Sequence, residues 1–277
     1  MQIITQSTIK ELFAYKMGDG CGLQFEAKYV NGMDLGGSSD AMRLGQWFEY
    51  KCTGALTKFG HVPAAKRLKP KKLTKKELGE GKNQEDVIGE LSKKYSDALV
   101  HVASFKQMLI DNDYEIVDKG LKLHDTKLGI KGDVDVVVRK KGDDKLIFID
   151  TKFSGLMENK WDDLGWADES LEYKDKIMIQ AVHYKLLGKQ IYGYEPDFYF
   201  WVFSSTNTTE IKNIKVVVSE DRFEEHKTII KNARTEFEKA AASKWIPRAT
   251  PKRCGECPLA DNCPHSVSLP KEQIVYY

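Results

Sequence analysis

Short apolar runs bounded by turn-forming residues predict the strands of this chain. Two runs rich in β-branched residues, Val134–Val138 and Leu146–Thr151, flank the turn-rich stretch Lys140–Lys145, which is typical of a β-hairpin. Strands are expected at Asp197–Phe203, where apolar and aromatic residues continue without a break from Phe198, and at Ile211–Val218. A strand that is apolar at every position suits a sheet covered on both faces. We therefore expect its aromatic residues in the core.

Helical periodicity predicts the segments that pack around these strands. The expected helical segments are residues 7–58, an amphipathic helix near 84–112, the apolar run Ile177–Leu187 and residues 220–242. The order of hairpin, helix, strand and strand favours an α/β or α+β fold, in which helices flank a mixed central sheet.

Charged residues on the predicted hairpin form a candidate metal site. Because side chains alternate along a strand, Asp150 and Lys152 share one face and Thr151 points to the other. A suitable register brings Asp135 of the partner strand close to Asp150, and two carboxylates suit Mg²⁺ or Mn²⁺. Lys152 could then polarise a water or stabilise charge on a phosphodiester. The alternative is that these residues, with Asp133, are solvent-facing charges of an amphipathic hairpin.

A glutamine and a tyrosine follow the hairpin on one helical face. Gln180 and Tyr184 are spaced i, i+4 within Ile177–Leu187, so both project from the same side of the expected helix. Alone, this spacing is more typical of an ordinary amphipathic helix with a half-buried tyrosine. Its position after the hairpin acids favours a contribution to the same site.

Three cysteines near the C-terminal end have the spacing of a metal site. Cys254, Cys257 and Cys263 follow a C-x2-C-x5-C pattern, which is a specific metal-binding signal. A tetrahedral or cubane site needs a fourth ligand. The candidates are Cys21, Cys52 and His265, and His265 leaves a zinc site open as an alternative.

In this order, the motifs resemble a known nuclease family. Ser7–Tyr29, Gly45–Glu49, the hairpin acids, the Gln-x-x-x-Tyr helix and the terminal cysteines are similar to the RecB-type branch of the PD-(D/E)XK nucleases. Its iron–sulfur members, such as the AddB nuclease domain and the CRISPR-adaptation nucleases, are the most similar. The resemblance implies a restriction-endonuclease-like core within one nuclease domain. That domain would span residues 1–277. It would consist of a helical N-terminal part at 1–60 that carries the first cluster cysteine, a catalytic core at 113–218 and a C-terminal cysteine cap at 245–277.

The resemblance also implies two sets of metal ligands. A 4Fe-4S cluster would be held by Cys21, Cys254, Cys257 and Cys263, and Cys52 would be left over. Such a cluster would tie the first helical segment to the last loop, so its loss would cost stability.

In the catalytic core, the resemblance makes Asp135 and Asp150 metal ligands, with the Thr151 carbonyl as a further ligand. Lys152 becomes the catalytic lysine. Glu49 takes a position where many relatives have a metal-binding histidine and other branches have a glutamate, so it too is an expected metal ligand. The resemblance therefore implies that a metal is used, but it does not specify which metal is preferred.

The family resemblance gives Gln180 and Tyr184 catalytic roles, because they match the motif that orders the active site and the DNA strand. It implies a Mg²⁺- or Mn²⁺-dependent DNA nuclease, foremost an exonuclease on single strands or duplex ends. Hydrolysis would proceed by in-line attack of a metal-activated water. The alternative is a non-cleaving DNA-binding or accessory subunit of a recombination, replication or CRISPR-adaptation complex. The presence of every expected catalytic group disfavours it.

Charge and cysteine content are compatible with this function without requiring it. The formal net charge is +2, but Lys66–Lys76 has seven basic residues in eleven. That run could attract phosphates, or it could be a solvated loop. Five cysteines without a signal peptide favour the cytoplasm, and no stretch approaches the ~20 apolar residues of a membrane span. Trp161 and Trp166, in the loop after the hairpin, could stack against a nucleic-acid end.

Overall fold

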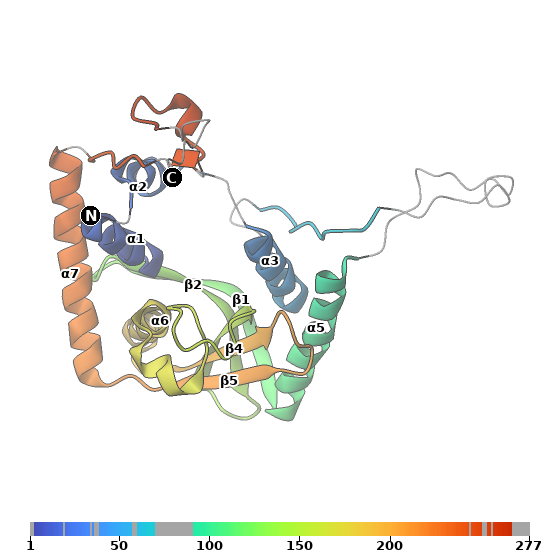
Figure 1. Ribbon diagram of the computed structural model, residues 1–277. Helices are drawn as coiled ribbons and strands as arrows, with labels where there is room; N and C mark the ends of the chain where they lie inside the picture. Colours follow the sequence, from blue (N-terminus) through green and yellow to red (C-terminus); the bar gives the residue numbers. More distant parts are fainter. Residues whose placement is uncertain are drawn as a thin grey trace, which may run out of the picture. The chain divides into compact units, whose positions relative to one another are not determined.

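The computed structural model divides into two compact units, and its helices and strands are labelled in Figure 1. It describes residues 3–18, 20–33, 35, 39–56, 60–69, 91–243, 245–250, 254–255 and 257–267. The first unit comprises Met1–Ser38, His124–Gly132 and Val218–Tyr277, and the second comprises Ser39–Leu123 and Asp133–Val217. Each unit is described by itself below. A single nuclease domain over residues 1–277 stays a prediction.

A five-stranded mixed sheet lies largely in the second unit. Its strands, in spatial order, are β1 (Tyr114–Asp125), β2 (Ile130–Lys140), β3 (Leu146–Ser154), β4 (Asp197–Ser204) and β5 (Ile211–Val216). β3 and β4 run parallel, and the pairs β2–β3 and β4–β5 are antiparallel. A parallel pair needs a long crossover connection, and α6 (Asp175–Tyr192) lies on that connection. The predicted mixed sheet with flanking helices is therefore confirmed.

The predicted hairpin is confirmed as β2 and β3, in which Val136 pairs with Ile149 and Arg139 pairs with Leu146. The two later strands are confirmed as β4 and β5. Strand β1 was not predicted from the sequence. It is an edge strand with mostly exposed residues, so it lacks the apolar alternation that marks a strand with one buried face.

The two faces of the sheet in the second unit carry different helices. Ile147 and Ile149 of β3 join an apolar cluster with α3 (Asp40–Thr53) and α5 (Lys93–Asp111). Side chains alternate along the strand, so Phe148 and Asp150 point to the other face, which α6 covers (Figure 1). The buried carboxylate of Asp150 thus lies between the sheet and α6.

The predicted helices differ from the observed ones chiefly at their ends. The amphipathic helix expected near 84–112 is α5 at Lys93–Asp111, and residues 84–90 lie outside the described residues. The last predicted helix is α7 (Glu220–Ser243). Two short 3-10 helices, η3 (Asp168–Tyr173) and η4 (Ala260–Asn262), were not predicted.

The N-terminal region is helical as predicted, but it is divided. Its pieces are α1 (Gln6–Met17), α2 (Gly22–Phe25), the π-helical turn η1 (Glu26–Val30) and α3. α1 begins with a capping box, in which Thr5 Oγ1 accepts a hydrogen bond from the Thr8 N–H at 3.0 Å. It ends at Gly18, whose φ of 92° is the left-handed conformation that suits glycine.

Aromatic packing holds the first unit together. Trp245, which follows α7, lies 5.4 Å from Tyr15 of α1 and 4.7 Å from Phe25 of α2, between ring centroids. Phe237 of α7 packs against Phe25 at 5.7 Å. These contacts bring the chain segment before the C-terminal cysteines next to α1 and α2. Among the helices that the structure describes, none combines the length and apolar character needed to cross a membrane.

Gly188 of α6 is a position where a single methyl group tests the packing of this helix on the sheet. An added Cβ would lie 2.4 Å from Pro196 Cγ and 3.0 Å from Phe148 Cε2. We expect Gly188→Ala to lower the free energy of unfolding by about 1–3 kcal/mol. Thermal unfolding followed by circular dichroism measures this as a Tm drop of roughly 2–4 °C per kcal/mol. The matched control is Gly45→Ala in α3, where an added Cβ meets nothing within 4 Å and stability should rise by about 0.5–1 kcal/mol. An unchanged Tm for Gly188→Ala would contradict the close packing of α6.

Candidate active site

Six polar side chains from four elements of the second unit meet beside β3. They are Glu49 of α3, Asp135 of β2, Asp150 and Lys152 of β3, and Gln180 and Tyr184 of α6. The structure therefore brings together the catalytic and oxygen-ligand candidates named from the sequence. Asp133 remains exposed on β2.

Asp150 is at the centre of this group. Its side chain is completely buried, and Gln180 Nε2 donates a hydrogen bond to its Oδ2. Lys152 Nζ forms a hydrogen-bonded ion pair with Oδ1. A buried carboxylate is costly unless charges and donors compensate it. Lys152, with 32 % of its side chain exposed, supplies that charge from the open side of the site.

Asp135 is held by Thr151 at the point where the β2–β3 pairing ends. The last residue pair of the β2–β3 ladder in that direction is Val136 with Ile149. One residue further, Asp135 Oδ2 accepts hydrogen bonds from the Thr151 N–H at 2.8 Å and from Thr151 Oγ1 at 3.1 Å. The Thr151 hydroxyl thus orients a carboxylate, a role that sequence reasoning missed. Threonine is so common in strands that the sequence carries no signal for it.

The electrostatics of the site show an excess of negative charge. Burial raises the pKa of Asp135 well above its usual range, and the charges of Asp150 and Glu49 raise it further. Burial and Asp150 likewise raise the pKa of Glu49, partly offset by Lys152. Burial alone would lower the pKa of Lys152, but Asp150 and Asp135 outweigh it and raise the pKa. Lys152 is therefore a cation and a donor at neutral pH, rather than a base.

The α6 residues act on Asp150 from the helix side. Tyr184 is buried and packs against Phe198 with ring centroids 6.1 Å apart. Burial raises its pKa, as do the charges of Asp150 and Asp135. A hydrogen bond links the Tyr184 side chain to Gln180, which in turn donates to Asp150. The i, i+4 pair therefore forms a chain of contacts that fixes the orientation of the Asp150 carboxylate.

The donor set of this site fits a hard divalent cation. Three carboxylates share one ammonium, and the buried Asp150 Oδ1 is compensated by that ammonium, from Lys152. Oxygen donors and net negative charge are what Mg²⁺ and Mn²⁺ require. Within the part of the chain that is described, no three His, Cys, Asp or Glu side chains are arranged to hold a metal ion. In this arrangement Lys152 and Gln180 contact the two oxygens of Asp150, so a cation at Asp150 requires Lys152 to move.

The cysteines named from the sequence come together in the first unit. Cys21, Cys254, Cys257 and Cys263 line one small pocket, which His265 also lines. Cys21 is brought there by its neighbour Gly22, whose N–H donates to Ile246 O at 3.1 Å. An added Cβ on Gly22 would lie 2.5 Å from that oxygen, so this close approach requires glycine.

Cys52, the other candidate for the fourth ligand, has different surroundings. It is buried in the apolar cluster between α3, α5 and the sheet, and burial raises the pKa of its thiol. Metals bind the thiolate, so these surroundings disfavour Cys52 as a ligand.

The two tryptophans of the loop after β3 have opposite environments. Trp161 is 86 % exposed, whereas Trp166 is only 4 % exposed and packs edge-on against Phe200 at 5.2 Å. Stacking of nucleic acid on Trp166 was therefore a wrong prediction. Lys174 fixes the loop by donating from Nζ to the Lys160 carbonyl at 2.7 Å and to the Asp162 carbonyl.

Comparisons with known proteins agree with this fold. The model of the PD-(D/E)XK nuclease superfamily matches residues 19–264. A crystal structure from Eubacterium rectale, described as a "Putative exonuclease", is similar with a TM-score of 0.58 and 18 % sequence identity, covering 99 % of this chain and 91 % of that chain. At this identity the likeness shows a shared fold. No curated protein matches the chain.

Replacing Glu49 tests the repulsion among the carboxylates. An acid whose pKa is raised by folding contributes stability that is fully present below its unfolded pKa, about 4.3 for Glu, and lost as pH rises through the folded pKa. At pH 8 without metal, ionised Glu49 therefore opposes folding. We expect Glu49→Gln to raise Tm at pH 8, by roughly 2–4 °C per kcal/mol of repulsion removed, with less change at pH 4.

Differential scanning fluorimetry in EDTA measures this difference, with Glu238→Gln on an exposed face of α7 as the matched control. Divalent cations should raise the Tm of the wild type more strongly as pH increases, because the ligands must be deprotonated. A Glu49→Gln variant with wild-type Tm at pH 8 would show that the carboxylates do not repel one another.

Proposed function

The chain belongs to the PD-(D/E)XK nuclease superfamily, and on that premise we propose that it is a Mg²⁺- or Mn²⁺-dependent DNA nuclease. The observation that carries the proposal is the buried Asp150, with two further carboxylates and the Lys152 ammonium beside it. We further propose an exonuclease of the RecB-type branch that acts on single strands or duplex ends. The similar Eubacterium rectale protein, whose description names an exonuclease, supports this choice.

The proposed metal ligands are Glu49, Asp135, Asp150 and the Thr151 carbonyl. A bound Mg²⁺ or Mn²⁺ would supply a Lewis acid and an activated water. The protein would supply the orientation of the ligands: Thr151 holds Asp135 through two hydrogen bonds, and Gln180 holds Asp150.

Lys152 is the proposed charge-stabilising donor. Its raised pKa keeps the ammonium protonated, and its partly exposed position allows contact with a substrate phosphate. Removing one fixed donor that stabilises developing negative charge costs about 10²–10³ in rate in enzymes of other classes. The same ammonium compensates Asp150 before substrate and metal bind, so it would exchange one anionic partner for another.

A second metal centre is proposed in the first unit. Cys21, Cys254, Cys257 and Cys263 would hold a structural 4Fe-4S cluster, and their common pocket supports this assignment. All five cysteines are free, as thiols are in a reducing compartment, and we propose a cytoplasmic location on that ground. His265 lines the same pocket, so zinc is the competing metal.

Lys152→Ala tests the nuclease. With end-labelled single- and double-stranded DNA and Mn²⁺ or Mg²⁺, we expect the variant to cleave about 10²-fold or more slowly than the wild type. The control is Lys140→Ala, an exposed lysine at the end of β2, which should cleave at the wild-type rate. A wild type that binds DNA but cleaves none with either metal would replace this proposal with a non-cleaving accessory subunit.

Cys263→Ser tests the cluster. Anaerobically purified wild type should be brown, contain about four irons per chain as a cubane requires, and lose stability when iron is removed. Cys263→Ser should lose iron and visible absorption, whereas Cys52→Ser should keep both. Bound zinc with no visible absorption in the wild type would contradict the iron–sulfur assignment.

A further inference from the structure

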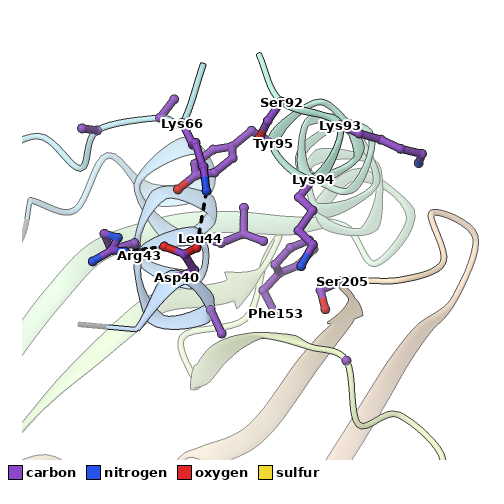
Figure 2. A pocket seen from close by; sticks show the side chains of 14 residues that line it. Asp40, Arg43, Leu44, Lys66, Ser92, Lys93, Lys94, Tyr95, Phe153 and Ser205 are labelled. Carbon is purple, nitrogen blue, oxygen red and sulfur yellow. Dashed lines mark hydrogen bonds and ion pairs between the residues drawn. The ribbon is translucent and has the colours of Figure 1, made fainter. Parts of the chain in front are cut away.

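We propose that a basic pocket of the second unit binds one nucleotide of single-stranded DNA beside the active site. This inference rests on the proposed nuclease function and names the substrate class. The pocket has a volume of about 680 Å³ and lies between α3, α5 and the ends of β3 and β4 (Figure 2). We call it the α3–α5 pocket; its lining includes Asp40, Arg43, Leu44, Lys66, Lys94 and Phe153.

Cations outnumber acids around the α3–α5 pocket. Arg43, Lys66 and Lys94 line it against one carboxylate, that of Asp40, while the fourth lining cation, Lys93, is paired with Asp97 outside it. Arg43 and Lys66 both pair with Asp40, the latter at 3.5 Å. The excess positive charge favours an anion such as a phosphate.

Lys94 is the cation best placed to receive that anion. Figure 2 shows its side chain directed into the pocket, toward Phe153 and Ser205. No ion pair joins Lys94 to any residue that the structure describes. The adjacent Lys93 differs, since its side chain is 86 % exposed and pairs with Asp97 at 2.6 Å. The two lysines thus provide a built-in comparison between an inward and an outward charge.

The basic run noted in the sequence begins at this pocket. Lys66 lines it, and the part of the run from residue 70 to 76 lies outside the described residues. Lys66, the first residue of that run, therefore lies where its ammonium could contact a phosphate bound in the pocket.

The floor of the pocket is apolar and aromatic. Leu44 and Tyr95 are buried there, and the partly exposed Phe153 stacks on Phe48 with centroids 4.8 Å apart and an interplanar angle of 19°. Bases stack on aromatic side chains with about 1–3 kcal/mol each. Cations at the rim and an aromatic floor together match the phosphate and the base of one nucleotide.

The pocket adjoins the candidate active site through two pairs of sequence neighbours. Phe153 follows Lys152 on β3 with its side chain on the opposite face of the sheet, toward α3 and α5, and Phe48 precedes Glu49 on α3, so the Phe48–Phe153 stack is joined to the catalytic groups through the end of β3 and through α3. Gly155, another lining residue, is three positions past Lys152, about 10 Å along an extended chain. A short stretch of one DNA strand could therefore reach both the α3–α5 pocket and the candidate active site.

The size and chemistry of the pocket favour an unpaired strand over a duplex. Its volume is in the range of pockets for small ligands, roughly 300–1,000 Å³, which suits a nucleotide. In a duplex the bases are stacked and paired, and a base reaches a pocket only after it leaves the stack. The apolar floor would thus be used only by a single strand.

Binding of a labelled single-stranded DNA of about 20 nucleotides to the full chain tests this inference. Binding is measured by fluorescence anisotropy across a salt series. EDTA is present to remove divalent cations, so that the DNA is not cleaved during the measurement. We expect Lys94→Gln to weaken binding about 3- to 10-fold and to reduce the salt slope by about 0.7, as for one lost phosphate contact on a single strand. Lys94→Arg should bind within about twofold of wild type, and the matched control Lys93→Gln should be unchanged. A blunt hairpin duplex should bind all four proteins equally.

The outcomes separate this inference from the proposed function. Wild-type binding by Lys94→Gln, or an equal loss with Lys93→Gln, would overturn the pocket as a strand site. An equal loss for duplex would overturn its single-strand character. Cleavage by the wild type is assayed separately on the same DNA. If it fails while binding still depends on Lys94, the nuclease proposal falls and the pocket stands.

Discussion

The buried carboxylate of Asp150 is the constraint on which the second unit depends. A strand that continues the apolar core of the sheet carries a negative charge into it, between β3 and α6. Such a charge persists only when donors and an opposite charge surround it. Gln180 provides the donor and Lys152 the charge, so the positions of α6 and of the end of β3 are both tied to this one group. The contacts of Asp150 with Gln180 and Lys152 offset the free-energy cost of burying its charge.

The compensation of Asp150 is incomplete, and this explains why the site is suited to a cation. Asp135 and Glu49 add negative charge that one ammonium does not balance, and burial and repulsion raise their pKa values. Stability alone would favour neutral residues at both positions, because like charges in a poorly solvated place oppose folding. Sites that keep such destabilising groups are commonly functional. The cost in stability is thus an argument for metal binding that does not depend on the resemblance to a family.

The sequence predicted the parts of this molecule that follow from periodicity and missed those set by tertiary contacts. The hairpin, β4, β5 and α6 carry clear patterns of buried positions, and each was found. Strand β1 was missed because an exposed edge strand needs no apolar alternation. Trp166 was misjudged because its burial against Phe200 depends on a loop held by Lys174. Neither the hydroxyl of Thr151 nor the inward direction of Lys94 has any local signature, since both depend on the strands and helices opposite them.

The two units differ in the chemistry of their donors, and this difference has a consequence for metal selection. The second unit gathers oxygen donors, while the first lines one pocket with sulfur. Hard cations such as Mg²⁺ prefer oxygen, and iron–sulfur centres or zinc prefer thiolates. Two sites of one type would compete for the same ion, whereas these two would not. The one thiol near the oxygen donors, Cys52, is buried among apolar side chains, and its pKa is raised by that burial. The thiolate form that would attract a soft metal is therefore suppressed in the unit whose oxygen donors suit a hard cation.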